Sequence, residues 1–129
     1  MNLVISGSRH VDIKHYTKYE KMIDEYISNY GTPDIIIAGG AEGIDKIAEM
    51  YAENKGIEIL VIEAQWYVNG IYDKSAGPKR NRKMIKKGTH LLAFPLEEDY
   101  VNKKGGTYNT IKQAKRAKLT VEIIPIKIE

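Results

Sequence analysis

The sequence predicts a three-layer α/β/α fold, in which helices cover both faces of a five-stranded, mainly parallel sheet. Short apolar runs alternate along the chain with stretches whose apolar residues recur every three or four positions. The runs are rich in β-branched residues and nearly continuous, as expected for strands buried on both faces. They occupy Leu3–Ile5, Ile35–Ala38, Ile57–Ile62, Leu91–Phe94 and Val121–Ile126.

The composition predicts a single domain over residues 1–129. Of these residues, 29% are charged and 43% are hydrophobic, which is ordinary for a soluble globular protein. The chain has no cysteine, which excludes disulfides and thiolate metal sites. No apolar run reaches the roughly 18–20 residues that cross a bilayer, and the chain opens directly on a strand pattern. We therefore expect a cytoplasmic protein that makes no contact with a membrane.

Four helices are expected between the strands. The first has five apolar residues at helical spacing and ends before Gly31 and Pro33: Tyr19, Ile23, Tyr26, Ile27 and Tyr30. The second ends at Gly56 and has its own apolar stripe: Ile44, Ile47, Ala48, Tyr51 and Ala52. Pro78 suits the first residue of a third helix that runs to Gly88, because a helix start needs no N–H there. The fourth carries Ile111, Ala114 and Ala117.

This strict alternation of strands and helices predicts a Rossmann-like domain. The stretch Glu63–Gly77 has no regular pattern, and a loop of that length is usually functional or mobile. Pro125 indicates that the last strand ends there or lies at an edge.

Two glycine loops point to a ligand. Ser6-Gly7-Ser8-Arg9 follows the first strand, and Gly39–Asp45 follows the second. A strand that ends in glycines and leads into a helix lets backbone N–H groups approach an anion, and the helix dipole favours negative charge there. In open parallel sheets, ligands bind at the carboxyl ends of the strands. The sequence therefore predicts a site for a phosphate-bearing ligand, with a nucleotide as the expected class.

In the first loop, Gly7 bares the backbone, while Ser8 offers a hydroxyl and Arg9 a guanidinium suited to phosphate. The alternative is a tight turn with a surface arginine. The loop has neither the Gly-x-Gly-x-x-Gly pattern nor a Walker lysine, so no standard dinucleotide oxidoreductase or P-loop NTPase is expected. We expect no cofactor.

The second loop is the stronger signal. Gly39 and Gly40 allow a close approach to a ligand, and Gly43 opens the next helix. Asp45 follows in the first turn, where a carboxylate either caps the helix or accepts hydrogen bonds from ribose hydroxyls. Both interpretations of Asp45 remain open.

The start of the third helix brings Gly77, Arg80 and Asn81 to the same edge. Arg80 is either a surface cation, a contact to phosphate or ribose, or a charge stabiliser in glycosidic cleavage. Trp66, the only tryptophan, either anchors the loop on the core or stacks on a base. Gly105-Gly106-Thr107 opens the fourth helix. This segment is either a third phosphate-binding helix start or a simple helix start capped by Thr107.

No metal site is expected. His10, His15 and His90 lack ligand spacing, and Glu97-Glu98-Asp99 is expected to be an exposed acidic loop. Seven basic residues lie within fourteen positions: Lys74, Lys79, Arg80, Arg82, Lys83, Lys86 and Lys87. This run is either a solvated helix face or a nucleic-acid-binding surface, next to which Trp66 and Tyr67 would stack on bases. The net charge of +3 is mild and argues against nucleic acid.

The order of these motifs resembles the SLOG superfamily, a Rossmann-like group that includes the DprA/SMF proteins and the LOG nucleoside phosphohydrolases. The closest likeness is to its small, single-domain YspA/YpsA-related branch. The motifs span nearly the whole chain: Ser6-Gly7-Ser8-Arg9, Gly39-Gly40-Ala41-Glu42-Gly43-Ile44-Asp45, Ala64-Gln65-Trp66, Ala76-Gly77-Pro78-x-Arg80-Asn81-x-x-Met84 and Gly105-Gly106-Thr107.

The resemblance implies binding of a nucleotide or a nucleotide-derived ligand. Arg80 matches the arginine of the LOG Arg-x-x-x-Met element, and Gly106-Thr107 matches part of the Pro-Gly-Gly-x-Gly-Thr-x-x-Glu motif. The glutamate of that motif falls on Thr110, and its proline is absent. A carboxylate that would stabilise an oxocarbenium-like transition state is therefore missing, unless Asp45 or Glu63 replaces it.

Three functions follow as hypotheses. The first is a nucleotide-binding or sensing domain. The second is an N-glycosidic hydrolase of nucleoside monophosphates, a LOG-like phosphoribohydrolase with Arg80 and Asp45 as its catalytic residues. The third is a DprA-like protein that binds single-stranded DNA. Related proteins form homodimers, so we also expect a homodimer, for which the nine tyrosines could supply apolar surface.

Overall fold

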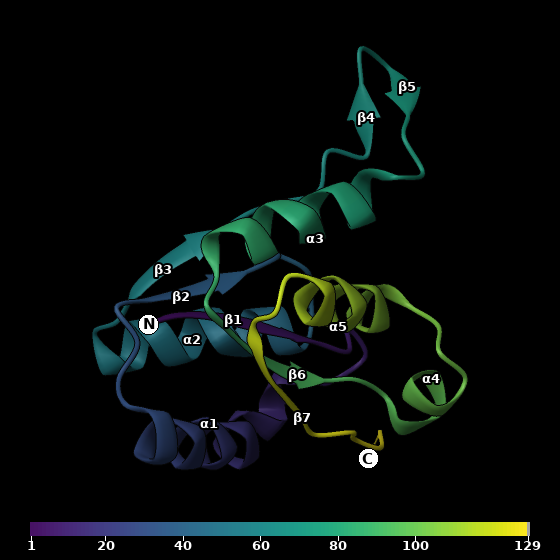
Figure 1. Cartoon of the computed structure of the whole chain (residues 1–129). Coiled ribbons are helices and arrows are strands. Elements are labelled where there is room, and N and C mark those ends of the chain that lie inside the picture. The colour runs from purple at the N-terminus through teal and green to yellow at the C-terminus, as the bar shows by residue number, and fades with distance from the viewer. Residues whose placement is uncertain (129) are drawn as a thin grey trace.

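Five parallel strands form the central sheet of the protein. The computed structural model describes residues 1–128 and places the strands in the order β3-β2-β1-β6-β7, with every neighbouring pair parallel (Figure 1). The strands are β1 (Asn2–Gly7), β2 (Ile35–Ala38), β3 (Glu58–Val61), β6 (His90–Phe94) and β7 (Thr120–Ile123). The predicted five-stranded Rossmann-like sheet is confirmed, and β7 is an edge strand that ends before Pro125.

Helices cover both faces of this sheet, as predicted (Figure 1). A short 3-10 helix precedes α1, and the helices are η1 (Ile13–His15), α1 (Tyr16–Tyr30), α2 (Ile44–Lys55), α3 (Ala76–Lys87), α4 (Glu97–Val101) and α5 (Gly106–Arg116). Helices α1 and α2 pack on one face, and α3 and α5 pack on the other. Among residues 1–128, none of the helices is long and apolar enough to cross a membrane.

The alternation of side chains along β1 divides the core into two layers. Leu3 and Ile5 pack in the cluster that contains the apolar residues of α1 and α2. Val4, between them, packs with Met84 of α3 and Ile111 of α5. Successive strand residues point to opposite faces, so a strand covered on both sides has to be apolar throughout.

The stretch 63–77, expected to be irregular, contains a β-hairpin. Its strands are β4 (Tyr67–Val68) and β5 (Ile71–Tyr72). Asn69 and Gly70 turn the chain with φ of 52° and 76°, which is the Asn-Gly signature of a two-residue hairpin loop. Figure 1 shows the hairpin projecting away from the sheet, beyond the start of α3.

Two helix starts differ from the expectations drawn from the sequence. The acidic residues Glu97-Glu98-Asp99 form the first turn of α4 rather than a loop, where carboxylates interact favourably with the helix dipole. Helix α3 begins at Ala76, before Pro78. Pro78 is tolerated inside the first turn because N–H groups there have no partner within the helix.

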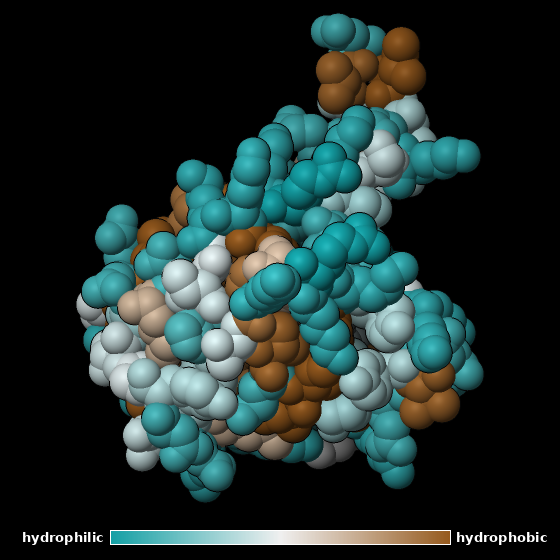
Figure 2. All heavy atoms as spheres, in the orientation of Figure 1, coloured by the Kyte–Doolittle hydropathy of each residue, from teal (hydrophilic) through white to brown (hydrophobic). Residues whose placement is uncertain are grey.

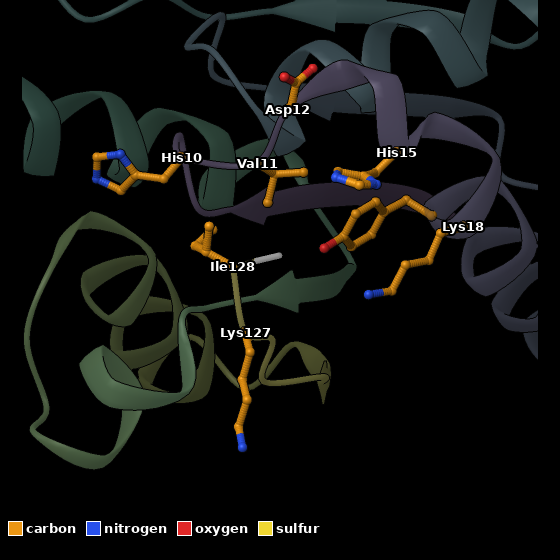
Figure 3. A pocket seen from close by; sticks show the side chains of 8 residues that line it. His10, Val11, Asp12, His15, Lys18, Lys127 and Ile128 are labelled. Atoms are coloured by element: carbon orange, nitrogen blue, oxygen red, sulfur yellow. The ribbon is translucent and has the colours of Figure 1, made fainter.

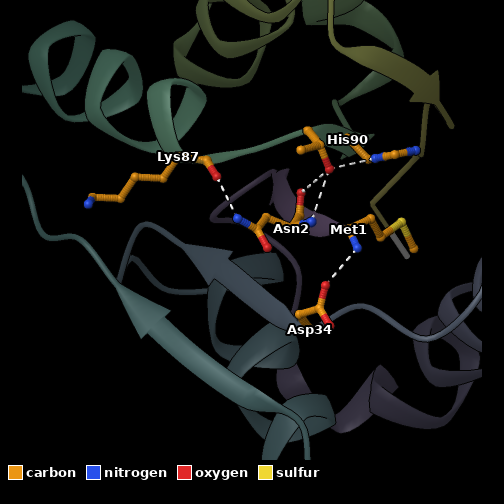
Figure 4. A network of polar contacts seen from close by, with 6 residues as sticks. Met1, Asn2, Asp34, Lys87 and His90 are labelled. Carbon is orange, nitrogen blue, oxygen red and sulfur yellow. Dashed lines mark hydrogen bonds and ion pairs between the residues drawn. The ribbon is translucent and has the colours of Figure 1, made fainter.

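Polar contacts hold the amino-terminal end of β1, opposite the carboxyl edge of the sheet (Figure 4). The terminal amine of Met1 lies 2.8 Å from Asp34 Oδ2, and its hydrogen bond and its charge lower the pKa of that carboxyl. Asn2 Nδ2 donates to the Lys87 carbonyl at 3.0 Å, and Asn2 N donates to Thr89 Oγ1 at 3.0 Å.

Candidate functional site

A cleft of about 870 Å³ lies at the carboxyl edge of the sheet. This volume falls in the roughly 300–1,000 Å³ range of small-molecule sites. Segments that follow β1, β2, β3 and β6 line it, together with the starts of α3 and α5. All the predicted binding residues except Gly43 line it: Gly7, Ser8, Arg9, Gly39, Gly40, Asp45, Trp66, Gly77, Arg80, Asn81, Gly105, Gly106 and Thr107.

Ser8 fixes the first glycine loop. Its backbone N–H donates to the Phe94 carbonyl at 3.1 Å, and its carbonyl accepts from Ile44 N at 3.1 Å. Its side-chain Oγ accepts from His10 N at 3.1 Å. The loop is thereby tied to β6 and to the start of α2, while Arg9 is exposed at the rim of the cleft.

Gly43, which was predicted as a ligand contact, is not among the described residues that line the cleft. A Cβ atom there would collide with the backbone of Ser8 and Arg9, and the φ of Gly43 is 75°. Gly43 therefore lets the two glycine loops touch each other, a role for which glycine is needed at this position.

Gly39 makes room for Arg80 and Asp45. Arg80 Nη1 donates to the Gly39 carbonyl at 2.5 Å. A Cβ atom on Gly39 would lie 2.5 Å from Arg80 Nη1 and 2.9 Å from Asp45 Oδ2. Any side chain at this position would therefore displace the guanidinium or the carboxylate.

Asp45 is a buried carboxyl that holds the second glycine loop. Its side chain is 7% exposed, and Oδ2 accepts a hydrogen bond from Ala41 N at 3.1 Å. Asp45 thus bonds to the loop before its helix rather than capping a later N–H group. Burial raises its pKa to about 6, although the Ala41 hydrogen bond and the Arg80 charge oppose the rise.

Asn81 joins α3 to the start of α5. It is 3% exposed, and its Nδ2 donates to Gly106 O at 3.3 Å and to Asn109 Oδ1 at 3.0 Å. Its Oδ1 accepts from Arg80 Nε at 2.9 Å. The buried amide therefore positions the arginine and the α5 start together.

The amino terminus of α5 is open toward the cleft. Gly105 precedes it with φ of 94°, and a Cβ atom on Gly106 would meet no other atom within 4 Å. Thr107 is the second residue of α5, and within residues 1–128 the N-cap residue, Gly105, makes no side-chain cap hydrogen bond. Unpaired N–H groups at a helix start are suited to binding an anion.

Trp66 anchors its loop on the protein, as one of its two predicted roles requires. Its ring packs over α3, with Cη2 at 3.3 Å from the position of a Cβ atom on Gly77. It also stacks on Tyr72, with ring centroids 6.2 Å apart and an interplanar angle of 9°. Trp66 is 43% exposed and lines the cleft.

Thr110 occupies the position where the LOG motif has glutamate. It is 1% exposed, and its hydroxyl donates to the Gly106 carbonyl at 3.1 Å. Residues that line the cleft but were not predicted include Asn109, Asp99 and Lys104. The position of the α4 segment directly after β6 could have indicated the last two, because every loop after a parallel strand reaches this edge.

A second, much smaller cavity of about 40 Å³ lies between the β1–α1 segment and the carboxyl-terminal segment (Figure 3). Its lining includes His10, Asp12, His15 and Lys127. It is far below the size of a nucleotide site.

Comparisons with known proteins agree with this architecture. A model of the YspA, cpYpsA-related SLOG family (YAcAr) matches residues 1–67. The structure of DNA processing protein A (DprA) from Streptococcus pneumoniae superposes with a TM-score of 0.73 at 20% identity, covering 98% of this chain and 51% of that one. No curated protein sequence matches this chain.

DprA from Helicobacter pylori, whose structure was described for its mode of binding single-stranded DNA, gives a TM-score of 0.68 at 16% identity. That match covers 98% of this chain and 66% of the H. pylori chain. This chain spans about half the length of the S. pneumoniae protein. The two likenesses establish the fold. Because the family model covers more than half of the 129 residues, including both glycine loops, the chain belongs to the YspA, cpYpsA-related SLOG family.

Proposed function

We propose that the cleft binds a nucleotide or a nucleotide-derived ligand, and that the protein acts as a binding or sensing domain. The observation that carries this proposal is the meeting of two glycine loops, the open start of α5 and two arginines, Arg9 and Arg80, around one cleft of about 870 Å³. Backbone N–H groups at helix starts and guanidinium groups are the usual ligands of phosphate in proteins.

The chemistry of the lining residues suits different parts of a nucleotide. Phosphate groups suit the open start of α5 and the guanidinium of Arg80, which keeps N–H donors beyond the two that it uses within the protein. Asp45 suits a ribose, because an ionised carboxylate accepts hydrogen bonds from hydroxyl groups. Trp66 at the rim suits the base, since an indole ring stacks on any of the bases.

Titration of the tryptophan fluorescence tests this proposal. Trp66 is the only tryptophan, so its emission reports directly on the cleft. We expect at least one member of a panel of nucleoside mono-, di- and triphosphates, NAD and ADP-ribose to change the emission with saturation. Arg80→Ala should move the midpoint of the change to a nucleotide concentration about 10–100-fold higher. Lys86→Ala, which removes an exposed cation from the same helix, should preserve it.

A hydrolase of nucleoside monophosphates is the alternative within the same cleft. Arg80 and Asp45 both border Gly39, so a cation stands beside a carboxyl whose pKa burial raises to about 6. Prolonged incubation with nucleoside monophosphates, followed by chromatography, tests it. If free base is released by the wild type and not by Asp45→Asn, the protein is an enzyme. If the substrate stays intact, the binding function is favoured.

Single-stranded DNA is a second candidate ligand, favoured by the exposed basic face of α3 and by the H. pylori likeness. The exposed cations of that face are Lys79, Arg82, Lys83, Lys86 and Lys87. Binding of oligo(dT) should weaken steeply as salt rises if phosphates are neutralised there. Oligonucleotide binding that competes with mononucleotides would place both ligands in the cleft.

A further inference from the structure

The net charge of +3 hides a separation of charge between the two faces of the sheet. Helices α3 and α5, which pack on one face, together carry nine Lys and Arg residues and no Asp or Glu. Helices α1 and α2, which pack on the other face, carry four basic and six acidic residues. The α3–α5 side of the protein is therefore strongly positive, and such a side attracts anionic partners.

The cations of α3 point away from the sheet. Met84 and Ile85 pack in the core layer beneath the helix, so its exposed side faces outward. Five of its cations are exposed: Lys79, Arg82, Lys83, Lys86 and Lys87. Within residues 1–128, Lys79 is the one member of this group that forms an ion pair, with Asp73 at 2.8 Å. The others remain available to an external anion.

The β4–β5 hairpin adds an apolar tip on the same side. It projects away from the sheet beyond the start of α3 (Figure 1), and Figure 2 shows brown side chains at its end, beyond the teal surface of α3. Tyr67 pairs with Tyr72 and Val68 with Ile71, so alternation puts the tyrosines on one face and the aliphatic pair on the other. The exposed fractions are 67% for Tyr67, 57% for Tyr72, 52% for Val68 and 72% for Ile71. An apolar element that projects into solvent marks an interaction site.

The base of the hairpin is tied to the helix that carries the cations. Tyr72 stacks on Trp66, which in turn packs over Gly77 at the start of α3. The carboxylate of Asp73 accepts a hydrogen bond from Ser75 N at 2.9 Å, in addition to its ion pair with α3. The apolar tip and the positive charges therefore approach a partner together.

The two faces of the hairpin indicate the kind of partner. Bases of a nucleic acid stack on aromatic rings, but they would leave Val68 and Ile71, on the opposite face, in water. A protein would need a socket that encloses both faces and an acidic surface beside it for α3. The interface of an anionic lipid bilayer meets both requirements without a matching shape, because it surrounds an inserted element on every side and attracts basic residues next to it.

The size and polarity of the tip suit the headgroup region of a bilayer. Strands of two residues with their turn reach on the order of 10 Å at about 3.3 Å per residue, and interfacial segments are buried by roughly 5–10 Å. The Asn69-Gly70 turn keeps polar backbone groups, which the hydrocarbon core would leave without partners. Tyrosine and tryptophan rings, which the hairpin and its base supply, concentrate at membrane–water interfaces.

We propose that the protein docks on anionic membranes through this surface, with the tip of the β4–β5 hairpin among the headgroups and the α3 cations on the lipid phosphates. The proposal goes beyond the nucleotide site and does not depend on it. Docking of this kind needs no spanning helix. It departs from our expectation of no membrane contact, which rested on the absence of a segment long enough to cross a bilayer.

Vesicle binding by the full chain tests this docking. The wild type should bind vesicles of equal parts phosphatidylcholine and phosphatidylglycerol at least about tenfold more tightly than vesicles of phosphatidylcholine alone. Added salt should weaken the binding. Trp66 is the only tryptophan, and its emission should shift to shorter wavelength on the anionic vesicles and be quenched by brominated acyl chains, because it lies at the base of the inserted tip.

A hairpin variant tests the apolar part of the contact. Val68→Ser with Ile71→Ser should lower the partition coefficient on the anionic vesicles by at least about tenfold, because burial of these side chains drives insertion. The matched control is Ile13→Ser with Val101→Ser, which alters two exposed apolar side chains on η1 and α4 and should leave the coefficient unchanged. Circular dichroism and thermal melts check that both variants fold.

A charge variant tests the contribution of α3. Lys83→Gln with Lys86→Gln should lower the partition coefficient by about 10–30-fold at low salt, and by less at high salt, where ions screen the charges. Lys14→Gln with Lys21→Gln removes the same charge from exposed positions on η1 and α1 and should have little effect.

The proposal would be overturned by a wild type that does not bind the anionic vesicles, or that binds phosphatidylcholine vesicles equally well. Unchanged Trp66 emission on bound vesicles, or full binding by the hairpin variant or by the α3 charge variant, would also contradict it. A protein that ignores vesicles but binds DNA through Lys83 and Lys86 would overturn it as well and would assign the surface to nucleic acid.

Discussion

Arg80 on α3 donates a hydrogen bond from its Nη1 to the carbonyl oxygen of Gly39, at the end of β2. This contact joins a helix on one face of the sheet to the glycine loop that leads to α2 on the other face. Asp45 approaches the same glycine, and burial raises its pKa although the Ala41 hydrogen bond and the Arg80 charge oppose the rise. The proposed ligand would meet all three groups at once.

Two substitutions of Arg80 should distinguish the contribution of its charge to nucleotide affinity from that of its guanidinium geometry. Arg80→Ala removes a charge-assisted contact worth roughly 1.5–3 kcal/mol, so nucleotide affinity should fall by about 10–100-fold. Arg80→Lys keeps the charge but cannot reproduce the fork that reaches Gly39 O and Asn81 Oδ1, and should recover only part of the affinity. Isothermal titration measures both. Equal affinity in Arg80→Ala and the wild type would remove Arg80 from the site.

Alanine substitutions at Gly106 and at Gly39 should have different effects on stability. Gly106→Ala meets no atom within 4 Å, so thermal stability should be unchanged or slightly higher, while phosphate binding at the α5 start should weaken by about tenfold. Gly39→Ala crowds Arg80 and Asp45 and should lower stability by about 1–3 kcal/mol. Thermal melts with and without nucleotide distinguish the two. Unchanged affinity in Gly106→Ala would argue against phosphate at α5.

The raised pKa of Asp45 predicts a pH-dependent contribution to stability. Its pKa is about 6 in the folded protein, against an ordinary value of 3.8, so the folded state holds the proton more tightly than the unfolded chain. This contribution is complete below about pH 4 and is lost as the pH rises through about 6. Asp45→Asn should therefore be more stable than the wild type by on the order of 1–3 kcal/mol above about pH 7.

Urea unfolding at several pH values measures this difference, which should vanish near about pH 4. Glu53→Gln, on the exposed surface of the same helix, is the control and should show no such trend. A wild type that gains stability over Asp45→Asn with rising pH would contradict the assignment.

Asn81 should matter for the shape of the cleft as well as for stability. Asn81→Ala leaves Arg80 Nε, Gly106 O and Asn109 Oδ1 without this partner. We expect a loss of about 1–3 kcal/mol in unfolding free energy. Hydrogen exchange should rise at the start of α5, because its tie to α3 is gone. Gln113→Ala, which removes a more exposed contact to Pro78 O at 3.1 Å, should have a smaller effect on both measurements.

The sheet and its main helices could be predicted from the sequence because burial on both faces makes each strand continuously apolar. The hairpin could not, because each of its strands has two residues, too few to show a period. Its Asn69-Gly70 turn was the one local signal available. The α4 turn was hidden in an acidic run, whose carboxylates are equally common in loops.

Most of the cleft could be predicted from loops that follow strands, since these loops reach one edge of the sheet. The place of Gly43 could not, because its contact with Ser8 depends on how two loops pack against each other. The pairing of Asn81 with Asn109 joins residues 28 positions apart and likewise arises only from the packing of α3 on α5.

Native mass spectrometry of the purified protein against nucleoside mono-, di- and triphosphates, NAD and ADP-ribose tests the nucleotide site most directly. The account predicts that the wild type retains at least one intact nucleotide of the panel and that Arg80→Ala does not, while Lys86→Ala binds as the wild type does. Absence of binding across the whole panel, or equal binding by Arg80→Ala, would contradict it.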